Sequence, residues 1–222
     1  MMKSNKNADS ILFSGEAHAA KYNSGNWIAR HLVNNFLKSI INIASRISPQ
    51  QIHEIGCGEG HISVLLAKHG FKIRACDINE NSLQVATREA KQRCLNIEFA
   101  VKSIYELDTL TDSADLVICC EVLEHLTDPE LALQRLVAIT QKDLIVSVPN
   151  EPIWHILNMV RGKYLYALGN TPGHFQHWTA RQFVRFISKY ADIVSVYSPL
   201  PWTVIHCKPC PGNKSNVFHP DT

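Results

Sequence analysis

The sequence predicts a single α/β domain built on a doubly wound, mostly parallel seven-stranded sheet with helices on both faces. Two observations support this fold class. First, strand-like segments alternate with segments of helical hydrophobic periodicity along most of the chain. Second, the last two predicted strands follow each other without an intervening helix, which adds an antiparallel closing hairpin at the edge of the sheet. With 222 residues, 45% of them hydrophobic, the chain can bury a sizeable core.

Apolar spacing predicts the elements of the first half of the chain. A helix is expected over Asn26–Ile47, where apolar residues recur at helical spacing. The same spacing predicts a helix over His61–His69 and another over Ser82–Cys94, with Asn81 or Ser82 as the cap of the latter. The strands expected between and after these helices are Gln51–Ile55, Phe71–Cys76 and Asn96–Val101.

Caps and apolar runs predict the second half. Ala114–Cys120 is an apolar strand of the kind that is buried on both faces of a parallel sheet. Asp128-Pro129 begins a helix, with Asp as N-cap and Pro at the first position, and its buried face extends to Thr140. Thr179 and Gln182 form a capping box ahead of a further helix. The remaining strands are predicted at Leu144–Val148, Ile193–Tyr197 and Thr203–Cys207.

The predicted domain, 1–222, divides into five segments. They are an N-terminal arm and helix (1–48), the main sheet (50–149), an insert (150–178), a closing helix and hairpin (179–208) and a flexible tail (209–222). The insert is longer than a tight connection and rich in Trp, Tyr, His and Gly, which is typical of a lid or binding loop. Trp154, Leu157 and Arg161 indicate an amphipathic helix within it, whose apolar side either covers a site or packs as plain core.

Composition excludes several classes of protein. The 22 Lys and Arg residues against 20 Asp and Glu give a net charge of +2, which disfavours a nucleic-acid binder that works by bulk charge. No apolar run approaches the roughly 18–20 residues that cross a bilayer, and no signal-peptide core follows the N-terminus, so a cytoplasmic location is expected. The seven cysteines are scattered, which fits a reducing compartment, and we interpret the pair Cys207 and Cys210 as incidental.

A glycine-rich turn joins the first strand to the next helix, with the sequence Glu54-Ile55-Gly56-Cys57-Gly58-Glu59-Gly60. Ligands of such sheets bind at the carboxyl ends of the strands, where glycine lets the backbone approach closely. A dinucleotide fingerprint would need glycine at position 61, and the chain has His61 there, which argues against NAD or FAD. Asp77, at the tip of the second strand, is placed to accept hydrogen bonds from both hydroxyls of a ribose.

Together these residues resemble the class I S-adenosylmethionine (SAM)-dependent methyltransferases, which have a Rossmann-like fold. Residues Ile52–Ser63, Ala75–Asn79 and Leu116–Asp128 are similar to the successive cofactor motifs of that family, and the resemblance spans roughly residues 50–205. It implies a methyltransferase with SAM as cofactor and residues 50–149 as the cofactor-binding sheet. The cofactor contacts that it implies are Glu54, Gly56, Cys57, Gly58 and Gly60 for methionine, Asp77 for ribose, Ile78, Ser103 and Ile104 for adenine, and Glu121 beside the cofactor.

A second cluster follows the fourth strand and contains Glu121, Glu124 and His125. If Glu121 opens a helix, these side chains share one face and form a half-site for Mg²⁺ or another divalent cation. His174 is the expected fourth ligand, and His177 is an equal alternative. This arrangement resembles two metal-dependent methyltransferase groups, one acting on the terminal 2′-hydroxyl of small RNAs and the other on catechol-like intermediates of ubiquinone biosynthesis.

The same cluster also has an interpretation without a metal. Glu-His-Leu after the fourth strand is widespread among class I methyltransferases that use no metal, where the Glu neighbours SAM and the His is structural or a general base. In that case His125 is the first candidate base, and His174 is the second.

The leading functional hypothesis is methyl transfer from SAM to a hydroxyl, or less readily an amine, of a small molecule held under the 150–178 insert. S-adenosylhomocysteine (SAH) would be released. The alternatives are a metal-dependent RNA 3′-terminal 2′-O-methyltransferase, which the balanced charge disfavours, and a non-catalytic SAM-binding partner subunit. Contact of the insert with a membrane surface ranks below a lid over a small molecule. An aromatic, a lipid-like and a nucleotide substrate all stay open.

Overall fold

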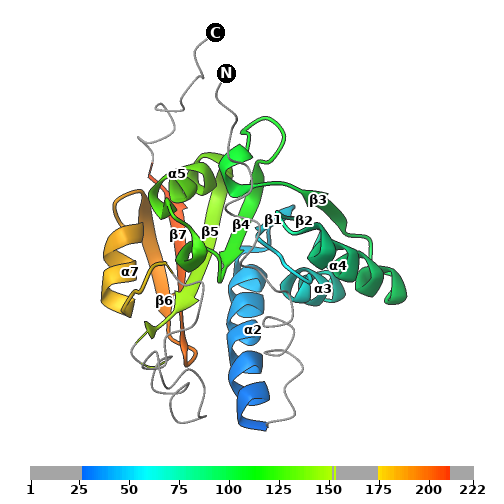
Figure 1. Ribbon diagram of the computed structural model, residues 1–222, viewed down its shortest axis with the longest axis horizontal. Helices are drawn as coiled ribbons and strands as arrows, with labels where there is room; N and C mark the ends of the chain where they lie inside the picture. The colour runs from blue at the N-terminus through cyan, green and yellow to red at the C-terminus, as the bar shows by residue number, and fades with distance from the viewer. Residues whose placement is uncertain (1–26, 152, 154–174, 211–222) are drawn as a thin grey trace, which may run out of the picture.

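The computed structural model describes residues 27–151, 153 and 175–210, which form a sheet with helices on both of its faces (Figure 1). Within these residues the sheet has seven strands in the order β3-β2-β1-β4-β5-β7-β6. The predicted fold class is therefore confirmed. Residues of the N-terminal arm before Trp27, the predicted amphipathic helix with Trp154, Leu157 and Arg161, His174, and the tail beyond Cys210 lie outside the described part of the chain.

The elements lie close to the predicted positions. The strands are β1 (Ile52–Ile55), β2 (Ile73–Asp77), β3 (Glu98–Val101), β4 (Ala114–Cys120), β5 (Thr140–Pro149), β6 (Ala191–Tyr197) and β7 (Trp202–Pro209). The helices are α2 (Trp27–Ile47), α3 (His61–Lys68), α4 (Glu80–Gln92), α5 (Pro129–Ile139) and α7 (Ala180–Ile187), with short 3₁₀ turns η1 (Ile104–Glu106) and η2 (Leu123–His125).

Helix ends follow the capping chemistry in the sequence, with two corrections. The Asp128 side chain accepts from Leu131 N at the start of α5, and Thr179 and Gln182 form the predicted capping box of α7. The cap of α4 is Asn79 rather than Asn81 or Ser82, because the Asn79 side chain accepts a hydrogen bond from Ser82 N in an extended backbone conformation. Thr140 is not on the face of α5: it ends that helix and begins β5.

The predicted closing hairpin is present and consists of β6 and β7. Its second strand, β7, pairs with β5, and its first strand, β6, lies at the edge of the sheet. β7 pairs antiparallel with β5, from Leu144 opposite Cys207 to Pro149 opposite Trp202, and β6 pairs antiparallel with β7 on the outside. The burial of the two strands explains this order. The first four residues of β7 are all buried, whereas β6 alternates between buried or half-buried and exposed residues, as an edge strand can.

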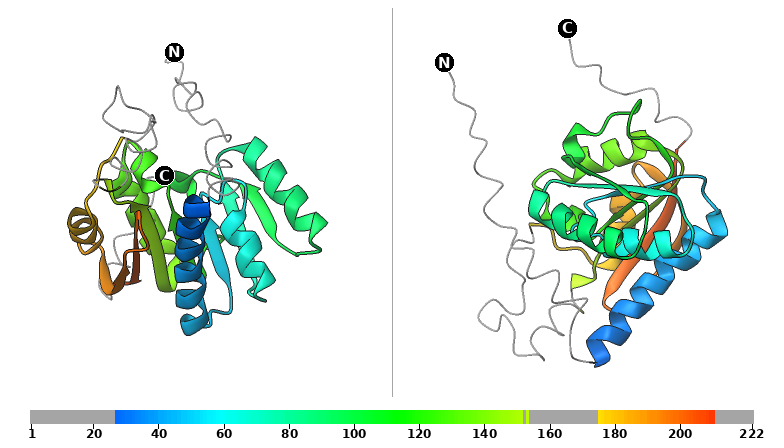
Figure 2. Two further views of the ribbon diagram at one scale, coloured as in Figure 1. Left: turned by 90° about the horizontal axis from the view of Figure 1, so that it is seen from below. Right: turned by 90° about the vertical axis from the view of Figure 1, so that its right-hand side faces the viewer.

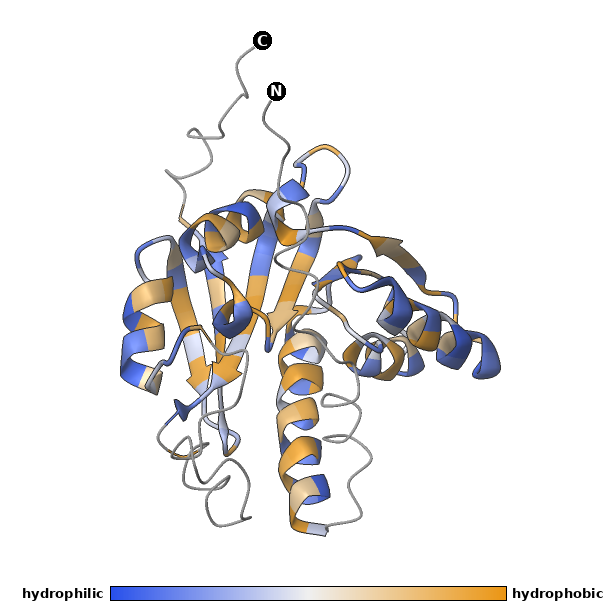
Figure 3. Cartoon of the chain, in the orientation of Figure 1, coloured by the Kyte–Doolittle hydropathy of each residue, from blue (hydrophilic) through white to orange (hydrophobic). Residues whose placement is uncertain are grey.

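The core has two parts, one on each face of the sheet. Val117 and Cys119 of β4 pack with residues of α5 and α7, whereas Leu116 and Ile118 of the same strand pack with α2 and α3 on the other face. Figure 2 shows the helices on the two faces of the sheet. Hydrophobic residues are accordingly concentrated in the central strands (Figure 3). Because β4 is covered on both sides, its continuous apolar run is explained. None of the helices in the described part is both long and apolar enough to cross a membrane.

Candidate functional site

The glycine loop at the carboxyl end of β1 has a backbone conformation that only glycine adopts without strain. Gly56, Gly58 and Gly60 have φ angles of +74°, +52° and +76°. A Cβ atom on Gly56 would lie 2.3 Å from Cγ2 of Val122, and one on Gly60 would lie 2.8 Å from the Cβ of Ala86. The loop is therefore packed between the segment after β4 and helix α4, where no side chain fits at these two positions.

Asp77, at the carboxyl end of β2, braces this loop. Its Oδ2 accepts a hydrogen bond of 2.7 Å from Gly58 N, and its Oδ1 accepts one of 2.8 Å from Asn79 N. A carboxylate has about four acceptor positions, so these two bonds leave capacity for ligand hydroxyls. Beside it, the Ile78 residue is 64% exposed and offers an apolar surface next to a hydrogen-bond acceptor. This pair suits a ribose with an attached base, and its role in binding one stays a prediction.

The other predicted base contacts lie beyond β3. The Ser103 side chain caps η1 by accepting a hydrogen bond from Tyr105 N. Ile104 is only 7% exposed and belongs to the core on the α5 face. A role for these two residues in binding adenine stays a prediction, and the burial of Ile104 leaves Ile78 as the more accessible apolar surface.

Glu54 lies buried in β1, beneath the glycine loop. Its Oε2 accepts a hydrogen bond from the buried Ser63 hydroxyl. Burial raises the pKa of the Glu54 carboxyl to about 8, and the nearby charge of Asp77 contributes to the rise. Cys57, next to the loop glycines, is also buried, and burial raises the pKa of its thiol well above the ordinary value. Cys57 is therefore unsuited to act as a nucleophile at neutral pH.

The segment after β4 does not form the helix expected from Glu121 onward. Glu121 has a left-handed backbone with φ of +61°, and its N–H donates to the Ser147 carbonyl at 3.0 Å, which continues the contact between β4 and β5. Its Oε2 accepts a 2.7 Å hydrogen bond from the indole Nε1 of Trp202. The turn η2 then begins at Leu123. Glu121, Glu124 and His125 therefore do not share one helical face.

The predicted metal half-site is not formed by the described residues. Within 27–151, 153 and 175–210, no three His, Cys, Asp or Glu side chains gather to hold a metal ion. The Glu124 side chain is 1% exposed, and its Oε1 lies 3.9 Å from Nε2 of His125. Phe175 N and Gln176 N both donate to the Glu124 carbonyl, so the segment that follows His174 does reach this turn. Because His174 lies outside the described residues, a metal site that includes it stays a prediction.

Two further residues at this edge of the sheet have no counterpart among the predicted site residues. Glu151, buried just beyond β5, donates its N–H to the Trp178 carbonyl at 3.2 Å, and its Oε1 lies 3.3 Å from Nδ1 of His177. These contacts bring the described residues on either side of 154–174 together. The second is Trp202, at the start of β7, whose indole binds Glu121. No local motif marks either residue, because each partner is distant in the chain.

Cys207 and Cys210 lie in two separate environments. The thiol of Cys207 is buried in β7 and donates to the Leu144 carbonyl, and burial raises its pKa to about 12. The thiol of Cys210 instead contacts Oδ1 of Asp192. The interpretation of the pair as incidental stays a prediction.

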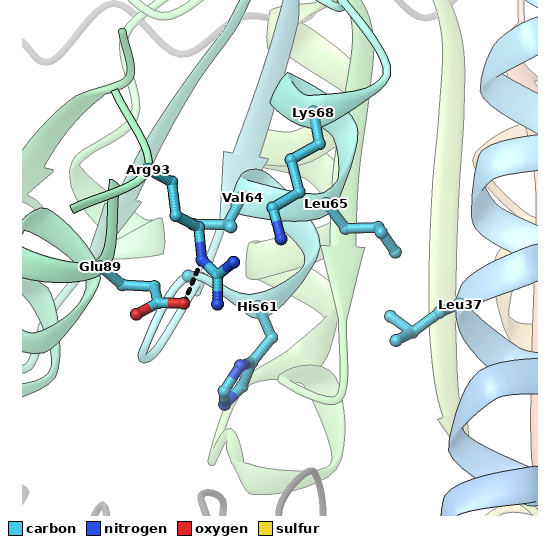
Figure 4. A pocket seen from close by; sticks show the side chains of 8 residues that line it. Leu37, His61, Val64, Leu65, Lys68, Glu89 and Arg93 are labelled. Atoms are coloured by element: carbon cyan, nitrogen blue, oxygen red, sulfur yellow. Dashed lines mark hydrogen bonds and ion pairs between the residues drawn. The ribbon is translucent and has the colours of Figure 1, made fainter. Parts of the chain in front are cut away.

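A pocket of about 170 Å³ lies away from this rim, between α2, α3 and α4 (Figure 4). Arg93 forms an ion pair with Glu89 on α4, while Lys68 and His61 project from α3 and Leu37 from α2. The pocket touches the glycine loop only through Gly60. The carboxyl edge of the sheet, rather than this pocket, holds the acids of the glycine loop and of the segments after β4 and β5, and it is the candidate functional site.

Comparisons with known proteins give the chain's relatives. A family model described as a methyltransferase domain matches residues 52–143, which include β1 to β4. An enzyme named ubiquinone biosynthesis O-methyltransferase from Coxiella burnetii is 31% identical over 109 residues, which are 49% of this chain and 47% of the relative. The enzyme of the same name from Rickettsia typhi is 30% identical over 171 residues, 77% of this chain and 66% of the relative. The chain thus spans about half the length of the first of these relatives.

Among solved structures, magnesium protoporphyrin IX methyltransferase from Synechocystis PCC 6803, crystallised with SAH, has a similar fold. Its TM-score is 0.69 at 16% identity, and the match covers 88% of this chain and 94% of the other. At this identity the likeness is one of fold alone.

Proposed function

Because the chain belongs to the class I SAM-dependent methyltransferases, we propose that it transfers a methyl group from SAM to a hydroxyl of a small molecule. The observation that carries the proposal is the glycine loop braced by Asp77 at the carboxyl edge of the sheet. The relatives named O-methyltransferases support a hydroxyl as acceptor, with an amine as the less favoured choice.

The residues at the rim fit the chemistry of SAM. SAM carries a ribose, an adenine and two positive centres, and the rim offers acceptors and carboxylates in a corresponding set. Asp77 would accept from the ribose hydroxyls, Ile78 would pack on the adenine, and Glu54 and Glu121 would face the methionine part. The close packing of Gly56 keeps side chains out of the loop that the ligand approaches.

When bound, SAM supplies an already activated methyl group, so the chain itself has to position the acceptor and remove a proton. We assign the role of general base, which removes the proton of the acceptor hydroxyl, to His125. Its side chain lies on η2 close to Glu124 and is 13% exposed. Glu124 would stabilise the imidazolium that forms. His174, the second candidate base, lies outside the described residues.

The acceptor in this proposal is a small molecule bound beside the 150–178 segment. No divalent cation is included, because the acidic residues after β4 do not gather in the described part of the chain. Titration with Mg²⁺ and Mn²⁺ tests that choice. Binding by the wild type that Glu124→Gln abolishes would favour a metal-dependent reaction instead.

The main test is calorimetric titration with SAM. Asp77→Ala should weaken SAM binding by about 100-fold, because two hydrogen bonds to a charged acceptor are lost together with the brace on Gly58. The matched control is Asp192→Ala, since Asp192 is exposed on β6 and far along the sheet order from β2. Undetectable SAM binding by the wild type would remove the proposal.

The acceptor class needs a second measurement. Incubation with methyl-labelled SAM and a panel of hydroxylated aromatic compounds and amines, followed by mass spectrometry, should give O-methyl products. Labelling of amines alone would contradict the choice of a hydroxyl.

A further inference from the structure

A buried hydrogen bond links the start of β7 to the end of β4. The indole Nε1 of Trp202 donates to Oε2 of Glu121 at 2.7 Å, across 81 residues of sequence. Both residues are buried, at 4% and 8% exposure. The Trp202 ring also packs against Phe36 of α2, with ring centroids 5.0 Å apart. Burying a carboxylate costs free energy unless the carboxylate is hydrogen-bonded, and the Trp202 indole supplies such a bond to Glu121.

The backbone of Glu121 is also unusual. Its φ of +61° lies in the left-handed region, which is unfavourable for a residue with a side chain. The conformation is maintained by the bond from Glu121 N to the Ser147 carbonyl and by the bond from Trp202 to the side chain. Such strain persists where surrounding structure imposes it, and it is concentrated at functional sites.

Glu121 lies next to the glycine loop. The residue that follows it, Val122, is the one whose Cγ2 a Cβ on Gly56 would meet at 2.3 Å. The residue that precedes it, Cys120, is buried at the end of β4. The pKa of the Cys120 thiol is raised well above its ordinary value, first by burial and then by the charges of Glu54 and Glu121. The contact between Val122 and Gly56 thus places Glu121 at the end of the sheet where the glycine loop is.

From this arrangement we propose that Trp202 is a positioning residue that holds the Glu121 carboxylate so that the site prefers the cationic methyl donor over its uncharged-sulfur product. The inference rests on the proposed function. SAM has a sulfonium centre, whereas SAH has a neutral thioether at the same place. A carboxylate in a buried site attracts the first strongly and is nearly indifferent to the second. The preference would favour loading of the donor and release of the product.

The test compares the affinities of SAM and SAH, measured by calorimetry without any acceptor. The wild type should bind SAM about tenfold more tightly than SAH. Glu121→Gln keeps the shape and a hydrogen-bond acceptor but removes the charge, so it should weaken SAM about tenfold and leave SAH unchanged. Trp202→Phe keeps the ring contact with Phe36 but not the donor, and should reduce the preference to about threefold. Trp27→Phe is the matched control, because Trp27 is 71% exposed.

The measured affinities distinguish failure of this inference from failure of the proposed function. Equal weakening of both ligands by Glu121→Gln would mean a purely structural role, and an unchanged ratio would mean no role in discrimination; either overturns the inference while the proposed function stands. If the wild type binds neither ligand, the proposed function fails and the inference fails with it. Circular dichroism melts identify a misfolded Trp202→Phe protein, and in that case the ratio for Glu121→Gln decides.

Discussion

The carboxyl ends of β1 and β2 and the carboxyl ends of β4 and β5 lie at one edge of the sheet but hold their polar groups in different ways. At the β1–β2 rim, Asp77 binds the N–H groups of Gly58 and Asn79, which are 19 and 2 residues away. At the β4–β5 rim, Glu121 is held by Trp202, 81 residues away. Glu151, just beyond β5, likewise contacts a later residue, His177.

The difference teaches which part of the site depends on local sequence. At the β1–β2 rim, Asp77 bonds to the loop across 19 residues, and Gly56 packs against Val122 after β4. The β4–β5 rim is assembled only when β7 and residues 175–178 have packed beside β5, since Trp202 and the N–H groups of Phe175 and Gln176 come from there. We therefore expect changes at the first rim to act through backbone fit and charge burial, and changes at the second to act through packing of distant segments.

The largest expected effect comes from Gly56→Ala. The added Cβ would approach Val122 Cγ2 within 2.3 Å at a positive φ, so we expect a loss of about 4 kcal/mol in the free energy of unfolding. Gly58→Ala has the same kind of φ but no atom within 4 Å, and should cost about 1–2 kcal/mol. Urea denaturation measures both variants.

The double variant Gly56→Ala with Val122→Ala sharpens that experiment. Removal of the Val122 side chain should recover part of the loss, because the clashing Cγ2 atom is gone. Equal destabilisation by Gly56→Ala and Gly58→Ala would break the comparison, since the loop would then not depend on its contact with the segment after β4.

A smaller effect is expected from pH, through Glu54. Burial raises the pKa of this carboxyl from 4.5 to about 8. The folded state therefore holds the proton more tightly than the unfolded state, and stability that is present below pH 4.5 is lost as the pH rises toward 8. Relative to Glu54→Gln, the wild type should lose roughly 2–4 kcal/mol of unfolding free energy between about pH 5 and about pH 8.5.

Urea denaturation of both proteins at several pH values checks this dependence. The matched control is Glu80→Gln, because Glu80 is an exposed residue in the first turn of α4. Parallel stability curves for the wild type and Glu54→Gln would show that Glu54 does not titrate in this range, and that the β1–β2 rim carries no buried acid of raised pKa.

The smallest effect is expected beside the β4–β5 rim. Thr179→Ala removes the side-chain acceptor of Gln182 N at the start of α7, which should cost about 1 kcal/mol of unfolding free energy. Thr179→Ser retains the hydroxyl and should stay close to the wild type. A loss well above about 2 kcal/mol would mean that this cap also holds residues 175–178 in place, and would make the second rim more sensitive than we infer.

Much of the fold was predictable because its signals are short in range. The apolar run of β4, the cap at Asp128 and the capping box at Thr179 each identify an element from a few neighbouring residues. The errors occurred where two elements compete for the same residues. Thr140 continues the apolar spacing of α5 but belongs to β5, because it pairs with Ala114 of β4. Asn79 rather than Asn81 caps α4, because Asn79 has the extended backbone from which its side chain accepts a bond from Ser82 N.

The candidate site shows the same division. The glycine loop and Asp77 follow from the sequence, because their spacing places them at adjacent strand ends in any sheet of this order. The prediction that Glu121, Glu124 and His125 share one face was wrong, because it assumed a helix that begins at Glu121. The bond from Glu121 N to the Ser147 carbonyl extends the β4–β5 contact and turns the chain before η2 begins.

The resemblance to a family, the alternation of the elements, and the glycine loop with its acid could all be predicted from the residues in order along the chain. These depend on hydrophobic period, caps and glycine conformations, which act between residues close together in the chain. The tertiary structure alone decided that β7 lies inside β6, that Trp202 holds Glu121 and that Glu151 contacts His177. Each of these contacts joins segments that are distant in the chain and that come together only when the whole core is buried. The spacing of residues along the chain therefore does not predict them.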